Sequence, residues 1–426
     1  MRRISTFGAA RIAVAAAVVA AGSVGSIASS SAKTARAAAG ATVDFYSSLP
    51  TVGSSSAQTI PAQNGMKLAL KLAGYKAGHY SINYTPMDDA TASQGQWTPA
   101  QTSADARKAA SDPKAVYYMG EFNSGASEVS MPILNRAGIP QDSPANTYVG
   151  LTASLKGVTA KGEPGVYFPT GKRTYTRIVP LDTIQGAADL DALKMAGCTK
   201  LAIFDDTQAY GAGLAAVLKD TAHMYGMQVV SVQSNATPQT DYSSVAQQFA
   251  SAGAQCVEVS ATTASVGGTA LVSAIHSALP KATVLGPDGM CTSAWVTDEK
   301  VLCTVATLDM KAYPGGKRFL AAYKKAYGVA NPDPYSIYGY ESAVLGINAL
   351  KTLPAGLSGA KLRSAMVKAL FAGKMQNSVL GNFKITKTGD TNLTSYGLYK
   401  LAPHNTKADT LTFDKTLHPT KYLHAS

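Results

Sequence analysis

Few residues of this chain combine the types and the spacing that catalysis needs. Ser124 lies in Asn123-Ser124-Gly125-Ala126, but no G-x-S-x-G motif surrounds it and no histidine stands in an obvious partner position. No H-E-x-x-H or other metal-binding spacing occurs among the six histidines, which are His79, His223, His276, His404, His418 and His424. We therefore predict no catalytic residue and no metal site.

Neither the two acid pairs nor the glycine-containing segments indicate catalysis or nucleotide binding. Asp88-Asp89 and Asp205-Asp206 each follow an expected strand, where acids commonly cap helices and turns, so a structural role is favoured over catalysis. The chain has no G-x-G-x-x-G after a strand and no G-x-x-x-x-G-K-[ST]. We predict that it uses no cofactor.

The basic charge does not indicate nucleic acid. The formal net charge is +12, but five basic residues and no acid lie in the first 37 positions, and beyond them 33 basic residues face 26 acidic ones, a balance of +7. No run of five basic residues occurs in that remainder. A phosphate-binding groove is therefore not expected.

The first 37 residues are typical of a signal peptide. Met1-Arg2-Arg3 precedes the apolar run Ile12–Ala21, which is too short to span a bilayer, and Ala35-Arg36-Ala37 supplies an A-x-A cleavage pattern. We predict a secreted or extracytoplasmic protein, in the periplasm or at the cell surface. No cysteine precedes Cys198, so a lipid-attachment site is absent.

Export would place the four cysteines in an oxidising environment, where disulfides form. Four cysteines allow three pairings, and all three are open. In one of them, Cys291 with Cys303 would close a short loop and Cys198 with Cys256 could link the starts of two neighbouring strands. Buried free thiols are the alternative. No C-x-x-C motif supports zinc or redox chemistry.

The elements that would position a site alternate between short apolar runs and segments of helical period, which predicts parallel strands covered by helices. A length of 426 residues favours two domains. Expected strands are 43–47, 80–84, 115–119, a short one near 139, 201–204, 228–232, 256–259 and 283–285. Expected helices are 62–73, 129–137, 215–222, 245–252, 271–279, 319–327, 342–353 and 358–370, followed by a Gly/Thr/Lys-rich stretch. The fold class is α/β.

Several segments, in order along the chain, resemble one family. They are Gly120-Glu121-Phe122-Asn123-Ser124-Gly125-Ala126, Ser143-Pro144-Ala145-Asn146-Thr147, Arg177-Ile178-Val179-Pro180-Leu181-Asp182-Thr183-Ile184-Gln185-Gly186, Asp205-Asp206-Thr207-Gln208-Ala209-Tyr210-Gly211, Asp241-Tyr242 and Leu285-Gly286-Pro287-Asp288-Gly289. Together they are similar to the type I periplasmic binding proteins of the branched-chain amino acid branch, the Leu/Ile/Val-binding receptors of ABC importers.

The resemblance implies a two-lobed fold in which each lobe is a parallel-sheet α/β sandwich and the chain crosses a hinge three times. The lobes implied are 38–176 plus 308–378, and 177–307 plus 379–426. The hinge is expected near 174–180, 303–312 and 376–384.

The resemblance also implies a ligand site between the lobes. Ser124 and Thr147 match hydroxyls that bind a carboxylate, and Ala145 matches a residue that offers backbone groups. Asp288 matches the acid that holds an ammonium group, and Tyr210 matches a tyrosine that closes over the ligand. Hydroxyls and amides at a helix start do suit a carboxylate, and an acid suits an ammonium group.

The side-chain pocket departs from the family pattern. Ser260-Ala261-Thr262-Thr263 stands where the family often has aromatic residues, and Ser54–Ser56 lie in a first-lobe loop without an aromatic residue. Thr262 and these serines would give a roomier or more polar pocket, and Tyr148 is a candidate aromatic wall. Asp288 replaces the more common glutamate, which shortens its reach by one methylene group.

The predicted function is an extracytoplasmic solute-binding protein of an ABC importer. It would bind a small amino acid or related carboxylate by lobe closure, act as a monomer with an ABC permease as partner, and catalyse nothing. The alternatives are a ligand-sensing receptor component of the same fold and a serine hydrolase built around Ser124.

Overall fold

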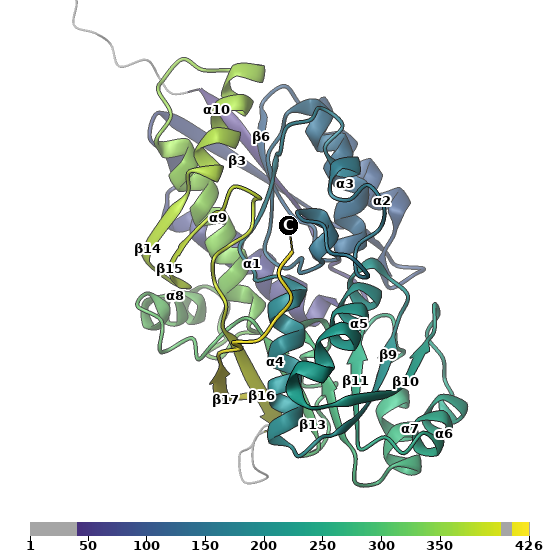
Figure 1. Ribbon diagram of the computed structural model, residues 1–426. Helices are drawn as coiled ribbons and strands as arrows, with labels where there is room; N and C mark the ends of the chain where they lie inside the picture. The colour runs from purple at the N-terminus through teal and green to yellow at the C-terminus, as the bar shows by residue number, and fades with distance from the viewer. Residues whose placement is uncertain (1–40, 402–410, 426) are drawn as a thin grey trace, which may run out of the picture. The chain divides into compact units, whose positions relative to one another are not determined.

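The chain forms two large β-sheets, and the central strands of each sheet are parallel to one another (Figure 1). The computed structural model describes residues 41–401 and 411–425, so the expected signal peptide and His404 lie outside the described residues. The strand order is β2-β3-β1-β6-β7-β8 in the first sheet and β10-β9-β11-β12-β13-β16-β17 in the second. The predicted two-lobed α/β class is confirmed, and we call the parts built on these sheets the first and second lobes.

The first sheet is formed by residues before 178. Its strands are β1 (Thr42–Ser48), β2 (Lys76–Ala77), β3 (Tyr80–Met87), β6 (Ala115–Met119), β7 (Gln141–Ser143) and β8 (Tyr175–Arg177). The helices between them are α1 (Ser56–Leu72), α2 (Pro99–Ser111) and α3 (Ser124–Ala137), and a small hairpin pairs β4 (Ala90–Thr91) with β5 (Gln96–Trp97). All five residues of β6 are buried, as expected of a central parallel strand.

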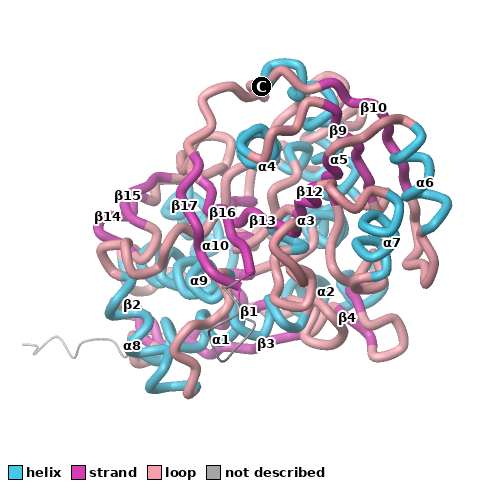
Figure 2. The backbone as a smooth tube through the Cα atoms, turned by 90° about the horizontal axis from the view of Figure 1, so that it is seen from below, coloured by secondary structure: helices cyan, strands magenta, loops and turns pink. Residues whose placement is uncertain are grey.

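The second sheet takes strands from two separate stretches of the chain. Its strands are β9 (Lys200–Asp205), β10 (Gln228–Ser234), β11 (Cys256–Ser260), β12 (Thr283–Gly286), β13 (Val301–Val305), β16 (Tyr396–Leu401) and β17 (Leu411–Leu417). The helices of this lobe are α4 (Asp182–Met195), α5 (Ala209–Thr221), α6 (Ser243–Ser251) and α7 (Ala270–Ala278). Figure 2 shows β16 and β17 beside β13.

Three late helices return to the first lobe. They are α8 (Gly316–Tyr327), α9 (Tyr335–Lys351) and α10 (Gly359–Phe371). In Figure 1 the green α9 lies beside the purple α1, and the two helices pack closely because glycines stand at their contact. A Cβ atom on Gly339 would lie 1.9 Å from Ala62 O, and one on Gly65 would lie 2.1 Å from Ser336 O. A side chain at either glycine would therefore push the helices apart.

The structure departs from the sequence expectations at several elements. The second sheet is not wholly parallel, because β16 pairs antiparallel with β13 and β17 antiparallel with β16. Helix α9 begins at Tyr335 rather than at 342, since the Asp333 carboxylate accepts a hydrogen bond from Tyr335 N. The expected lobe boundary at 378 falls inside a separate hairpin of β14 (Lys374–Ser378) and β15 (Gly381–Lys384).

Two disulfides resolve the three open pairings. Cys198 pairs with Cys256, with the Cα atoms 6.1 Å apart, and Cys291 pairs with Cys303, with the Cα atoms 5.2 Å apart. The first joins the starts of the neighbouring strands β9 and β11. Within 41–401 and 411–425 no helix has both the length and the apolar character to cross a membrane, and no group of three or more His, Cys, Asp or Glu could hold a metal ion.

Candidate functional site: a cavity between the lobes

The structure brings all six residues of the predicted site to one cavity. The cavity is lined by Phe122, Asn123, Ser124, Ala145, Thr147, Tyr210, Thr262, Asp288, Gly289 and Tyr335. Most of them follow the carboxyl ends of β6, β7, β11 and β12, which is where parallel α/β sheets place their ligands. The first lobe supplies the Ser124 side of the cavity, and the second lobe supplies Tyr210, Thr262 and Asp288.

The cavity is small because the walls contact one another. Its volume is about 20 Å³, which is room for a single water molecule. Phe122 and Tyr335 stand edge to face with ring centroids 5.1 Å apart. A Cβ atom on Gly289 would approach both Tyr210 Cε1 and Thr262 Cγ2 to 3.1 Å. A ligand of several heavy atoms therefore requires these walls to move apart.

One side of the cavity is formed by the start of a helix and two hydroxyl groups. Helix α3 begins at Ser124, where the first amides of a helix have no intrahelical acceptor and the helix dipole favours negative charge. Ser124 Oγ accepts a hydrogen bond from Tyr148 N at 3.4 Å, which leaves the hydroxyl hydrogen free to donate. Thr147 Oγ1 is buried and lies beside the buried carboxyl group of Asp182, whose pKa the Thr147 hydroxyl lowers. The Ala145 amide is already bound to Ser143 Oγ at 3.1 Å.

The other end of the cavity is the carboxylate of Asp288. Its Oδ1 accepts hydrogen bonds from Tyr210 Oη at 2.5 Å and Gln185 Nε2 at 2.6 Å, and its Oδ2 accepts one from Tyr335 Oη. Burial raises the pKa of Asp288, while these hydrogen bonds lower it. No described lysine, arginine or histidine forms an ion pair with this acid. The site therefore holds a buried carboxylate without a cation.

Three contacts of Asp288 come from residues that the sequence analysis missed. Tyr335 begins α9 of the first lobe, so its hydrogen bond to Asp288 crosses between the lobes. Gln58 in α1 makes a second crossing, since its Nε2 donates to Asp288 O at 2.7 Å. Gln185 lies in α4, within a segment quoted for its family likeness. Asp333-Pro334 before Tyr335 is a helix-start signal that would have located α9.

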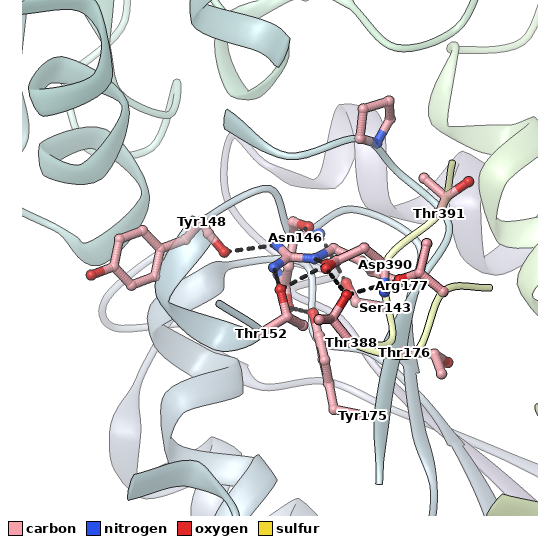
Figure 3. A network of polar contacts seen from close by, with 12 residues as sticks. Ser143, Asn146, Tyr148, Thr152, Tyr175, Thr176, Arg177, Thr388, Asp390 and Thr391 are labelled. Atoms are coloured by element: carbon pink, nitrogen blue, oxygen red, sulfur yellow. Dashed lines mark hydrogen bonds and ion pairs between the residues drawn. The ribbon is translucent and has the colours of Figure 1, made fainter. Parts of the chain in front are cut away.

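The loop that carries Ala145 and Thr147 is held by a buried arginine (Figure 3). Arg177, which has no exposed surface, donates to Asn146 O at 3.0 Å and Tyr148 O at 2.7 Å, and pairs with Asp390 Oδ1 at 2.8 Å. Thr152 Oγ1 also binds Asp390 Oδ1, at 2.7 Å. Arg177 ends β8 and Asp390 lies between β15 and β16. The Arg177–Asp390 pair thus joins the end of β8 to the segment between β15 and β16, and Arg177 also holds the loop that carries Ala145 and Thr147.

Two groups of residues expected at the side-chain pocket do not line the cavity as described. Tyr148 does not line the cavity: its ring packs on Gly213 of α5, and its hydroxyl donates to Glu163 Oε2 at 2.8 Å. Ser54–Ser56 lie at the start of α1 and do not line the cavity either. Aromatic walls are present after all, supplied by Phe122 and Tyr335 from other parts of the chain.

No arrangement for serine catalysis surrounds Ser124. Its hydroxyl has one hydrogen-bond partner in the described chain, a backbone amide, so a general base is absent from its contacts. Three of the four acids in the pairs named in the sequence analysis bind backbone amides: Asp205 accepts from Thr207 N, Asp206 from Gln208 N, and Asp88 from Ala90 N.

Two sheet-based lobes with a polar cavity between them define a class of protein, the two-lobed solute-binding proteins. The family model described as "Periplasmic binding protein" matches residues 47–403, and the chain belongs to this family. The predicted likeness to its branched-chain amino acid branch is confirmed.

Curated relatives agree with this assignment. The chain is 25% identical to "Leu/Ile/Val-binding protein homolog 3" of Brucella melitensis over 291 residues, which cover 67% of this chain and 72% of that protein. It is 23% identical to "Amino acid binding protein" of Pseudomonas aeruginosa over 310 residues, 71% of this chain and 76% of the relative.

Solved structures share the fold. The leucine-binding protein LivK of Thermotoga maritima has a TM-score of 0.73 at 20% identity, covering 88% of this chain and 99% of its own. An ABC transporter solute-binding protein of R. palustris, in complex with benzoate, has a TM-score of 0.70 at 19% identity, covering 89% and 97%. LivJ of Streptococcus pneumoniae, in complex with isoleucine, has a TM-score of 0.68 at 17% identity, covering 88% and 100%.

Proposed function

We propose that the protein is the extracytoplasmic solute-binding component of an ABC importer and that it binds a small amino acid or related carboxylate between its lobes. One observation carries the proposal. Ser124, Ala145, Thr147, Tyr210, Thr262 and Asp288 converge on one cavity with a helix start at one end and an acid at the other. The relatives named for leucine, isoleucine, valine or other amino acids support the same class of ligand.

The charge balance of the cavity favours a ligand that carries its own cation. Tyr210, Tyr335 and Gln185 are uncharged donors, so they stabilise the Asp288 carboxylate without neutralising it. A buried unpaired charge is costly. An ammonium group bound at Asp288 would supply the missing charge, while the carboxylate of the same ligand would meet the Ser124 and Thr147 hydroxyls and the start of α3.

Binding would act on the separation of the lobes. A ligand shifts a conformational equilibrium only as far as its affinities for the two states differ. Because Tyr335 and Gln58 of the first lobe touch Asp288 of the second, a ligand enclosed there contacts both lobes only when they are closed. Closed, ligand-loaded protein would then dock on an ABC permease as a monomer.

The expected lobe boundaries need one revision in this proposal. We keep the first crossing near 174–180 and the second near 303–312 but move the third from 376–384 to 385–395. Ile385 N bonds to Gly373 O after α10, which ties the β14–β15 hairpin to the first lobe. The second sheet resumes only at Tyr396.

A ligand screen tests the proposal directly. The melting temperature would be measured with each of the twenty L-amino acids, benzoate and 4-hydroxybenzoate. A compound at 100 times its dissociation constant should stabilise the native protein by about 2.7 kcal/mol. We expect at least one amino acid or carboxylate to raise the melting temperature, and their methyl esters to have no effect. No shift with any of them would contradict the proposal.

A transport measurement separates import from sensing. Deletion of the gene should abolish uptake of the radiolabelled compound that scores in the screen. Normal uptake together with lost transcriptional response to that compound would instead favour the receptor alternative.

A further inference from the structure

A tryptophan outside the six predicted site residues packs on the first turn of helix α3, whose first residue, Ser124, lines the cavity. Trp97 ends the small hairpin β4–β5 of the first lobe and packs on Gly125, the second residue of α3. The contact is close, since a Cβ atom on Gly125 would lie 2.9 Å from Trp97 Cζ2 and 3.1 Å from its Cη2. The indole ring therefore lies against the helix start that offers its amides to a ligand.

The same side chain reaches the second lobe. Trp97 Nε1 donates a hydrogen bond to Gln208 Oε1 at 3.1 Å. Gln208 is the residue before α5, two positions ahead of Tyr210, which lines the cavity. The bond joins the lobes on the Ser124 side of the cavity, whereas Tyr335 and Gln58 join them at Asp288.

The hairpin that presents Trp97 is anchored in the first lobe. Asp88 binds Thr51 N and Ala90 N, each at 2.9 Å, and Thr98 N donates to Asp89 O, also at 2.9 Å. At the tip, a Cβ atom on Gly53 would lie 1.7 Å from Gly95 O, so the two backbones touch. The ring is thus carried by a fixed support, and the bond to Gln208 forms only when the second lobe is near.

We propose that Trp97 is a further positioning residue of the binding site, which seals the start of α3 and joins the lobes through Gln208 when the cleft closes. The role of Trp97 in ligand binding rests on the proposed function, whereas its contacts with Gly125 and Gln208 do not depend on it. Excluding water from the helix start strengthens its hydrogen bonds to a ligand carboxylate, because the local dielectric falls. The bond to Gln208 stabilises the closed protein over the open one.

The chain has only two tryptophans, which makes the contact directly observable. Protein labelled with ¹⁵N-indole tryptophan should give one indole resonance for each, assigned with Trp97→Phe and Trp295→Phe. Gln208→Leu removes the acceptor while keeping most of the side-chain volume. In the ligand-bound protein we expect it to move the Trp97 resonance and speed its hydrogen exchange about tenfold, leaving the Trp295 resonance in place. Gln247→Leu, at an exposed glutamine of α6, should change neither.

The affinity measurement uses the compound with the largest shift among the twenty amino acids, benzoate and 4-hydroxybenzoate. Gln208→Leu and Trp97→Phe should each raise its dissociation constant about fivefold, mostly through faster dissociation, as expected for one neutral hydrogen bond. The double variant should lose little more, because both changes remove the same bond.

Two outcomes would overturn the inference. One is a Trp97 resonance and exchange rate that Gln208→Leu leaves unchanged. The other is less than a twofold change in the dissociation constant for both variants. Failure of every compound to bind would instead contradict the proposed function, whereas binding together with an unchanged Trp97 resonance in the ligand-bound protein would contradict the Trp97 contact alone.

Discussion

The side chain of Asp288 accepts hydrogen bonds only from uncharged donors. Its negative charge should therefore contribute most to the affinity for ligands that carry an ammonium group. Asp288→Asn keeps the shape of the side chain and can still bond to Gln185 and the tyrosines, but it removes the negative charge. We expect the dissociation constant of an amino acid that scores in the screen to rise more than tenfold, measured by calorimetry. Asp241→Asn, at an exposed acid of the second lobe, is the matched control and should leave affinity unchanged. Equal affinity of Asp288→Asn and wild type would remove the ammonium assignment.

The Arg177–Asp390 pair should contribute far more to stability than a surface pair. Asp390→Ala leaves the fully buried guanidinium without its carboxylate, and breaking a buried pair on one side typically costs about 3–5 kcal/mol. Asp414→Ala removes the partner of Lys400, whose side chain is 47% exposed, and should cost about 1 kcal/mol or less. Urea unfolding of both variants checks the difference, and similar midpoints would show that Arg177 is not held as described.

Some residues at the cavity follow strands that the sequence indicates, and others come from distant elements that only the packing of the fold brings to the site. The grouping of Ser124, Thr147 and Asp288 at one cavity could be expected from the sequence, because each follows a strand within a segment of family likeness. Tyr335, Gln58 and Trp97 were not, since each comes from an element whose distance from Asp288 or Gly125 depends on packing of whole helices and a hairpin. No local pattern around Gln58 or Trp97 indicates such a contact. Only Tyr335 carried a usable signal, in Asp333-Pro334.

The packing of α1 on α9 sets the position of two cavity contacts at once, because α1 carries Gln58 and α9 begins with Tyr335. Gly339→Ala would place a methyl group within 1.9 Å of Ala62 O and must separate the helices. Overpacking of this kind typically costs about 1–3 kcal/mol. We expect lower stability and weaker ligand binding together. Gly165→Ala, at a glycine with open space around it and ordinary backbone angles, should change neither stability nor affinity.

Elements with strong apolar runs were predicted well, and those without them were missed. The buried strands β1, β6, β9 and β11 fall within a residue or two of expectation, because short runs rich in apolar residues mark a strand covered on both faces. Helix α2 has a polar sequence and was missed, although Thr98 and Pro99 form a recognisable start, with Thr98 Oγ1 accepting from Gln101 N. Strands β16 and β17 were also missed: β16 contains a glycine and a lysine, and the edge strand β17 mixes apolar residues with threonine, aspartate and lysine.

Taken over both lobes, the described chain buries many carboxyl groups and pairs few of them with cations. Its ion pairs with a lysine or arginine are Arg177–Asp390 and Lys400–Asp414, and His276 lies 3.2 Å from Asp298. Burial raises the pKa of several acids that have no such pair: Asp89 and Asp182 to about 8, Asp142, Asp333 and Glu341 to about 7, and Asp206 to about 6. The native protein therefore holds protons that the unfolded chain would release at neutral pH.

This proton balance predicts that stability falls as the pH rises. An acid with a raised native pKa contributes its full stability below its unfolded pKa, near 4, and loses that contribution as the pH climbs through the native value. Between the unfolded and the native pKa, each such group lowers the free energy of unfolding by up to about 1.4 kcal/mol per pH unit. We expect a higher melting temperature at pH 5 than at pH 8. Asp89→Asn, which mimics the protonated side chain, should flatten this dependence, whereas Asp220→Asn at an exposed acid should not. A melting temperature that rises from pH 5 to pH 8 would show that these carboxyl groups ionise in the native protein.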